Sequence, residues 1–165
     1  MKFAHKHNIP APAQQAWDMT SNPDFITASY QKANATYKLI STEQRDGKTF
    51  NKILVTVNES LPSVAAKFIG ASNLSYEQHE TVDHEQMRNE WEIIVPKISS
   101  KVKATGSFSI MDRGASCERV MEGEVKVSIP FVGGKIESII AKQLGKSQED
   151  IVNLLIELLG KSQSL

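Results

Sequence analysis

Residues 133–159 read GGKIESIIAKQLGKSQEDIVNLLIELL, and their pattern decides the fold. The apolar residues recur three or four positions apart, which is the spacing of one face of an α-helix. They are Ile136, Ile139, Ile140, Leu144, Ile151, Leu154, Leu155 and Leu158. The opposite face carries charged side chains: Lys135, Lys142, Lys146, Glu149, Asp150 and Lys161. The stretch predicts a long helix with one face on a large apolar surface and the other in water, bent or loosened at Gly145.

Before this helix, the sequence shows the alternation of apolar and polar residues that is typical of β-strands. We expect strands at residues 3–9, 35–44, 50–57, 74–82, 87–95, 102–111 and 117–129. Asp46-Gly47 has the composition of a tight hairpin turn between the second and third of these strands. Because consecutive strands joined by short turns are most simply antiparallel neighbours, the sequence predicts an antiparallel meander.

Two short helices are expected between the first strand and the second. Pro12 suits the start of a helix because its missing N–H would be unpaired there anyway, and Trp17 is the expected core anchor of that helix. Phe25 lies on the apolar side of the other helix, after a break at residues 21–23. Residues 64–69 are expected to form a brief apolar connection that ends at Gly70.

The composition favours one ordinary folded domain, residues 1–165. A chain of 165 residues can bury a core without disulfides or metals, and its 19 basic and 19 acidic side chains balance. This balance gives no support for nucleic-acid binding. Cys117 is the only cysteine, which excludes an intramolecular disulfide and a cysteine-based zinc cluster and fits a reducing compartment.

We expect a cytoplasmic protein. The N-terminal residues contain no apolar stretch of signal-peptide length. The most apolar segment, residues 151–159, is interrupted by Asn153 and Glu157 and falls short of the ~20 residues that cross a bilayer. Stable membrane insertion is therefore not expected, whereas transient docking on a membrane or a partner through this segment stays open as an alternative.

The order of these elements resembles the START-like superfamily (SRPBCC, helix-grip), which includes lipid-transfer domains, plant hormone receptors and polyketide cyclases. Residues 123–137, GEVKVSIPFVGGKIE, are similar to the strand-to-helix signature V-x-I-P-F-V-G-G-K-I-E of an uncharacterised bacterial family within it. Leu61-Pro62, residues 67–70 and the strand pair that leads to Trp91 also resemble that family. The chain departs from the family pattern where Gly145 and the polar residues 146–148 interrupt the helix.

The resemblance implies an α+β helix-grip fold, in which a curved antiparallel β-sheet of about seven strands wraps a long C-terminal helix, with two short helices after strand 1. It also implies an apolar ligand cavity between the sheet and that helix. The residues expected to line the cavity are Tyr37, Leu39, Ile53, Val55, Tyr76, Trp91, Ile93, Thr105, Ser107, Ile136, Ile140 and Leu144, with Thr105 and Ser107 as polar handles. For any one apolar residue, a place in an ordinary core is the simpler interpretation.

No metal and no cofactor is predicted. His5 and His7 lie two apart on a strand, so both rings can project to one side with their Cα atoms about 7 Å apart. A metal needs at least one further ligand, and no motif surrounds His79 or His84, so we interpret His5 and His7 as solvated or hydrogen-bonded. Gly133-Gly134 lacks phosphate-loop spacing and is interpreted as a sharp turn that lets the helix pack closely on the sheet.

Catalytic residues are not predicted either, because no nucleophile elbow, metalloprotease pair or carboxylate cluster occurs. Cys117, with Arg119 as its local cation, is interpreted as an inert thiol. If the protein has an acid–base centre, His79 or Glu80 is the nearest candidate.

The leading hypothesis is a carrier or binder of a small hydrophobic, lipid-like molecule held between the sheet and the C-terminal helix. One alternative is a cyclase or dehydratase that uses the same cavity, and this alternative predicts an inward-facing His, Glu or Arg. A second alternative is a protein-interaction module with a filled core and an exposed apolar patch. The oligomeric state is not predicted.

Overall fold

The computed structural model describes residues 1–163, except for the side chains of Ile139 and Gln163. Its elements are β1 (Lys2–Ile9), α1 (Ala13–Thr20), α2 (Pro23–Lys32), β2 (Ala35–Arg45), β3 (Lys48–Ser60), α3 (Ser63–Ile69), β4 (Asn73–Asp83), β5 (Arg88–Ile94), β6 (Val102–Asp112), β7 (Cys117–Val127) and α4 (Gly133–Gln163). The last two residues of the expected domain, and the Ile139 side chain of the expected apolar stripe, lie outside the described part.

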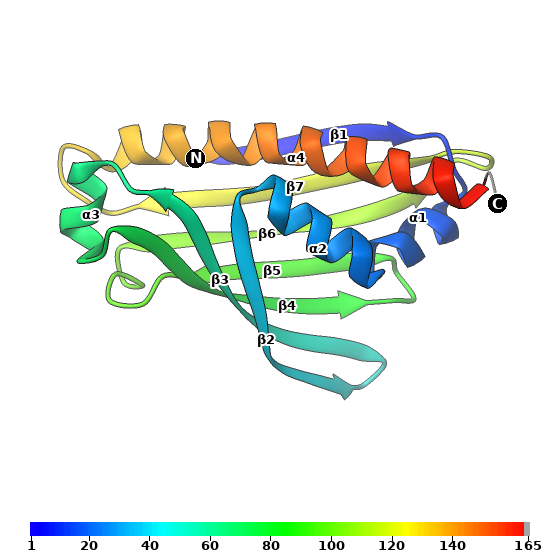
Figure 1. The fold of residues 1–165 in the computed structure, drawn as a ribbon, viewed down its shortest axis with the longest axis horizontal. Coiled ribbons are helices and arrows are strands. Elements are labelled where there is room, and N and C mark those ends of the chain that lie inside the picture. Colours follow the sequence, from blue (N-terminus) through cyan, green and yellow to red (C-terminus); the bar gives the residue numbers. More distant parts are fainter. Residues whose placement is uncertain (164–165) are drawn as a thin grey trace.

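The strands form one antiparallel sheet in the order β1-β7-β6-β5-β4-β3-β2. Strands β2 to β7 are thus a meander, and β1 closes onto β7. In Figure 1, α4 runs along the β1 and β7 side of the sheet, and the β2–β3 hairpin bends away from the line of the other strands. This arrangement confirms the predicted helix-grip α+β fold with a curved antiparallel sheet.

Local sequence signals account for several element boundaries. Asp46 and Gly47 both have positive φ, 53° and 74°, as the two central residues of a type I′ hairpin turn require. The Asn22 side chain accepts a hydrogen bond from the backbone N–H of Asp24 and caps the start of α2. Residues 63–69, which we expected only as a brief apolar connection, form the helix α3. Gly70 ends α3 in the left-handed conformation that glycine adopts without strain.

The helix α4 runs beside β1 in the same direction. Glu137 contacts Met1, a Cβ atom at Gly145 would lie 3.2 Å from His5 Cε1, and Leu155 packs with Ile9. The helix shows no break at Gly145, where we expected a bend or loosening. Glycine at this position instead lets α4 approach the His5 ring.

The start of α4 is held closely against the end of β7. A Cβ atom at Gly133 would lie 2.2 Å from the carbonyl oxygen of Val127, so only glycine fits there. The Glu137 side chain accepts a 2.7 Å hydrogen bond from the backbone N–H of Val127, and this bond lowers the pKa of the Glu137 carboxyl. These contacts confirm that Gly133 permits close packing of the helix on the sheet.

The two halves of α4 are buried to different extents. In the second half, Val152, Leu154, Leu155 and Leu159 are buried in a core with residues of β1, α1 and α2. In the first half, Ile136, Ile140 and Leu144 face the sheet but remain partly exposed. Figure 1 shows α1 and α2 at the end of the molecule that holds the last turns of α4. Among the described residues, no helix is long and apolar enough to cross a bilayer.

Two glycines in the middle of the sheet make room for a pair of aromatic rings. Gly123 and Gly106 are neighbours on β7 and β6, and they lie in one row between Phe3 and Trp91. A Cβ atom would come within 2.4 Å of the Trp91 ring at Gly106 and within 2.5 Å of the Phe3 ring at Gly123. The two rings therefore lie over the glycines and stack with their centroids 6.4 Å apart.

We expect Gly106→Ala to destabilise the protein by about 1–3 kcal/mol, since the new methyl group would also lie 2.4 Å from the carbonyl oxygen of Glu122. The matched control is Gly160→Ala in α4, where a Cβ atom meets nothing within 4 Å. This change should raise the stability by up to about 1 kcal/mol through helix propensity. Urea unfolding measures both; equal midpoints for the two variants would contradict the packing described here.

Candidate ligand-binding site

The apolar side chains on the inner face, which is the face that α4 covers, form three separate clusters. The Trp17 cluster joins β1, α1, α2 and the second half of α4, and its largest members include Ile9, Trp17, Phe25 and Leu155. The Trp91 cluster comprises Trp91, Ala104, Met121, Val125, Val127 and Ile129, with Phe3, Ile93, Phe108, Ile136, Ile140 and Leu144 among the partly buried residues around it. The Tyr76 cluster comprises Ala35, Ile53 and Val55, with Tyr30, Tyr37 and Tyr76. Phe108 packs against both the Trp17 and the Trp91 clusters, whereas the Tyr76 cluster shares no residue with either.

Nine of the residues expected to line a cavity fall into two of these clusters. Tyr37, Ile53, Val55 and Tyr76 belong to the Tyr76 cluster, whereas Trp91, Ile93, Ile136, Ile140 and Leu144 belong to the Trp91 cluster. Leu39 belongs to none and is 49% exposed, next to an irregularity in the pairing of β2 with β3. The structure thus brings most of the set to one face of the sheet, and their contact with a ligand stays a prediction.

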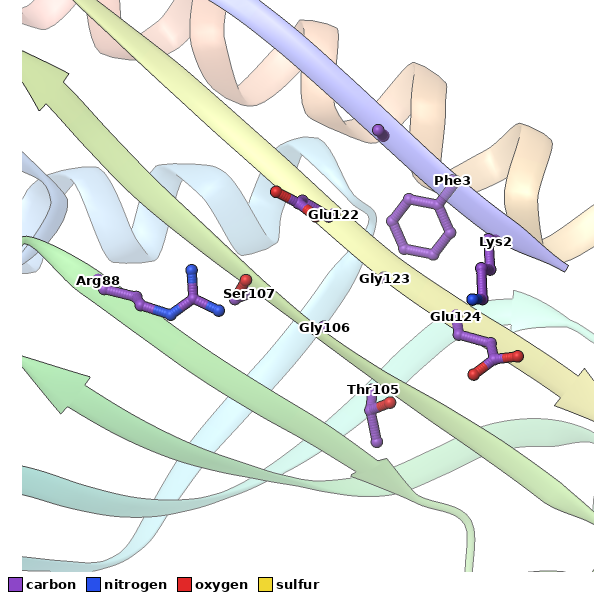
Figure 2. A pocket seen from close by; sticks show the side chains of 10 residues that line it. Lys2, Phe3, Arg88, Thr105, Gly106, Ser107, Glu122, Gly123 and Glu124 are labelled. Carbon is purple, nitrogen blue, oxygen red and sulfur yellow. The ribbon is translucent and has the colours of Figure 1, made fainter.

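Thr105 and Ser107 do not point toward α4, which corrects the expectation that they are inward polar handles. Strand residues alternate between faces, and Ala104 and Phe108 of the same strand pack in the Trp91 cluster. Thr105 and Ser107 instead line an open depression of about 610 Å³ on the outer face. Figure 2 shows it, with Lys2, Arg88, Glu122 and Glu124 around it and α4 behind the strands. Gly106, which lies between them on β6, occupies the inward position beside Trp91, so its two neighbours Thr105 and Ser107 face outward.

A row of polar side chains lies on the inner face between the Trp91 and Tyr76 clusters. Glu80 pairs across the sheet with Trp91 on one side and Asn51 on the other. Its carboxylate accepts hydrogen bonds from Gln78 Nε2 at 2.6 Å and from Asn51 Nδ2 at 3.4 Å. His79 faces the other way and contacts Glu77 at 3.0 Å. Of the two acid–base candidates, only Glu80 is on the inner face.

Three tyrosines, Tyr30, Tyr37 and Tyr76, pack together in the neighbouring Tyr76 cluster. Tyr30 stacks on Tyr37 with ring centroids 4.5 Å apart. Burial, with a contribution from the charge of Glu80, raises the pKa of Tyr30, and burial raises the pKa of Tyr76 to about 12. The phenols of Tyr30 and Tyr76 therefore carry their protons at neutral pH and can donate hydrogen bonds.

A second polar group lies beneath α4, at the junction of the Trp17 and Trp91 clusters. We call it the Arg119 group, and its members are His5, His7, Asn89, Arg119 and Gln148. Each has a buried nitrogen or oxygen atom without a hydrogen-bond partner in the described part of the chain: His5 Nε2, His7 Nδ1, Asn89 Oδ1, Arg119 Nη1 and Gln148 Oε1. Such atoms are rare in native proteins and call for a partner, since each costs on the order of 1–3 kcal/mol when left unpaired.

The sheet register and α4 place this group together. His7 of β1 is directly opposite Arg119 of β7. His5 is directly opposite Met121, which pairs with Phe108, which in turn pairs with Asn89. The Arg119 guanidinium carbon lies 4.7 Å from the centroid of the Phe108 ring.

The electrostatics of the Arg119 group are those of a buried cation. Burial lowers the pKa of Arg119 to about 10, so the guanidinium stays charged at neutral pH. Burial, Arg119 and His5 together lower the pKa of His7, against a smaller opposite effect of Glu149. His7 is therefore predominantly neutral at pH 7 and can donate or accept a hydrogen bond.

Our sequence interpretation missed most of this group. The histidines were expected to be solvated or hydrogen-bonded, but both face the interior with a buried, unpartnered nitrogen. Arg119 was considered only as a neighbour of Cys117, whose pKa is in fact raised by burial and by Asp112. The signal was available in part: Arg119 alternates in phase with Cys117 and Met121, and Gln148 follows Leu144 by one helical turn.

No group of three or more His, Cys, Asp or Glu side chains within residues 1–163 is arranged to hold a metal ion. The candidate site is thus an interior with two polar groups, one around Glu80 and one around Arg119, separated by apolar side chains.

Solved structures of similar fold share little sequence with this chain. The Zhui aromatase/cyclase from Streptomyces sp. R1128 is 9% identical, with a TM-score of 0.67 over 98% of this chain and 94% of that one. Norcoclaurine synthase from Thalictrum flavum is 19% identical, with a TM-score of 0.64 over 95% and 87%. A START superfamily protein from Mycobacterium smegmatis is 12% identical, with a TM-score of 0.61 over 97% of each chain. These likenesses confirm the START-like fold.

No protein with a curated description matches the sequence. A family model described as "Protein of unknown function (DUF2505)" matches residues 4–153. Because this match spans most of the chain, the protein belongs to the DUF2505 family.

Proposed function

We propose that this protein binds a small hydrophobic molecule between the inner face of the sheet and the first half of α4. The observation that carries the proposal is the partial burial of Ile136, Ile140 and Leu144 of α4, together with the separation of the Trp91 cluster from the Tyr76 cluster. A ligand in this space would remove their remaining apolar surface from water, worth about 25 cal/mol per Å².

The polar groups support a binding site over a filled core. Small-molecule sites are mainly apolar, with a few polar groups that orient the ligand. Glu80 and Arg119 are such polar groups, because each lies on the inner face next to apolar clusters. The norcoclaurine synthase structure of the same fold is described with dopamine and hydroxybenzaldehyde bound. The second alternative, an interaction module, predicts a filled interior, and the partly exposed residues of α4 argue against it.

We propose that the protein acts in the cytoplasm and contacts membranes only transiently.

Native mass spectrometry of freshly purified protein tests the proposal, with 1-decanol as the titrated probe. We expect either a co-purified hydrophobic molecule or a saturable decanol adduct. Ile140→Trp adds an indole to the space beneath α4 and should abolish the adduct, whereas Val64→Trp, at an exposed position of α3, should leave it unchanged. Absence of any adduct in the wild-type protein would reject the proposal.

The unequal burial of α4 predicts unequal costs of truncation. Leu155 is fully buried, so Leu155→Ala should lower the free energy of unfolding by about 2–5 kcal/mol. Leu144 is partly exposed, and Leu144→Ala should cost only about 1–2 kcal/mol because less apolar surface is lost. Urea unfolding measures the difference. Equal costs would mean that the first half of α4 covers a filled core.

The cyclase or dehydratase alternative is favoured by one observation: Glu80 is an inward carboxylate whose charge acts on the buried phenol of Tyr30. A carboxylate in this position can accept a proton from a bound molecule while a phenol donates one to the departing oxygen. If the ligand found by mass spectrometry loses water during incubation, Glu80→Gln should abolish this reaction and retain binding. A matched change on the outer face is Glu77→Gln, which should leave the reaction unaffected. A ligand that returns unaltered argues for binding alone.

A further inference from the structure

Arg119 is a buried cation without an anion. Its side chain is on the inner face, the residue is only 5% exposed, and Nη1 has no hydrogen-bond partner. None of the salt bridges among residues 1–163 involves it. The face of the Phe108 ring, 4.7 Å away, is its described neighbour on one side, and a ring face cannot replace the hydrogen bonds that Nη1 lost with water.

Other buried polar groups lie near Arg119 by their places in the sheet and on α4. His7 is its direct partner across β1 and β7. Because α4 runs beside β1 in the same direction and Gly145 lies over His5, Gln148, one turn further, comes over the His7 and Arg119 pair. Gln148 is 5% exposed and its Oε1 is unpaired. Asn89, 7% exposed with an unpaired Oδ1, lies beyond Phe108.

A buried guanidinium that lacks an ion partner costs several kcal/mol, which a matching anion in the same space would offset. The planar fork of arginine donors fits a carboxylate with two parallel hydrogen bonds. One cation beside a predominantly neutral His7 matches a single negative charge, as a carboxylate carries, better than the double charge of a phosphate monoester. Glu149 is exposed on α4 and acts on His7 only from a distance.

We propose that Arg119, with His7, binds the carboxylate of an amphipathic acid whose apolar part lies along the Trp91 cluster. This inference rests on the proposed function and names the ligand class. Phe108, which packs against both the Trp17 and Trp91 clusters, marks the boundary between the charged end and the apolar part. From there, Met121 and Leu144 lead toward the partly exposed first half of α4.

The experiment compares decanoate with 1-decanol, which share a chain length and differ in charge. Isothermal titration calorimetry at pH 7.5 is expected to show that decanoate binds about 10- to 100-fold more tightly than 1-decanol. This is the range expected for a hydrogen bond to a charged group. Arg119→Met should lose this preference while keeping its affinity for decanol. Arg113→Met, at an exposed arginine in the turn between β6 and β7, is the matched control and should behave as the wild type.

Thermal unfolding without ligand gives a second readout. Removal of an unpaired buried charge should raise the Tm of Arg119→Met by about 2–4 °C, whereas loss of a structural partner would lower it. Arg119→Lys gives an independent readout and should weaken the preference for decanoate, since an ammonium lacks the planar fork.

The outcomes separate this inference from the proposed function. If neither probe binds the wild-type protein, the proposed function fails. If both probes bind equally well, or if Arg119→Met keeps the preference for decanoate, the ligand site stands and the assignment of Arg119 is overturned. A fall in the Tm of Arg119→Met would also overturn the assignment.

Discussion

The apolar stripe of α4 must be removed from water, and α4 packs closely against β1 and β7. Gly133 allows the backbone of α4 to meet the carbonyl of Val127, and Gly145 allows it to pass over His5. With the helix held at this side of the sheet, the opposite strands curve around it. How completely the region between the helix and β3–β5 is packed then depends on the size of the side chains that point into it.

The filling is uneven. Beneath the last turns of α4, residues of β1, α1 and α2 pack into a buried core. Beneath the first turns, the aromatic pair of Phe3 and Trp91 lies flat over two glycines and leaves the helix stripe partly exposed. The second half of α4 therefore stabilises the fold, and the first half is the part that we propose covers a ligand. The polar residues on the inner face agree with the proposed ligand site, because an unpaired guanidinium destabilises an apolar core.

Membership of a family of unknown function leaves the chemistry of the site as the main guide. Folds of this kind occur in an aromatase/cyclase and in norcoclaurine synthase, but a shared fold at such low identity does not carry an activity. The inner face of this chain holds a carboxylate next to the Tyr76 cluster at one position and a cation among neutral donors and acceptors at another. The ligand class that we propose, an acidic amphiphile, follows from the second position, and the proposed alternative activity follows from the first.

The sequence by itself determined the elements whose causes are local. The periods of two and of three to four, the Asp46-Gly47 turn and the prolines placed the strands, the hairpin and the helices within a few residues, and the meander followed from short connections. It missed α3, because seven residues form a helix only with the support of their surroundings. The faces of the strands could be inferred only where apolar residues mark them, so Thr105 and Ser107 were assigned to the wrong side.

The tertiary structure alone decided which polar groups meet. His7 and Arg119 are more than a hundred residues apart in sequence, and only the closure of β1 onto β7 makes them direct partners. The path of α4 then adds Gln148, which in sequence belongs to an ordinary polar patch. The burial of these groups without partners is a property of the space between several elements. Periodicity describes one element at a time, and therefore it carries no information about that space.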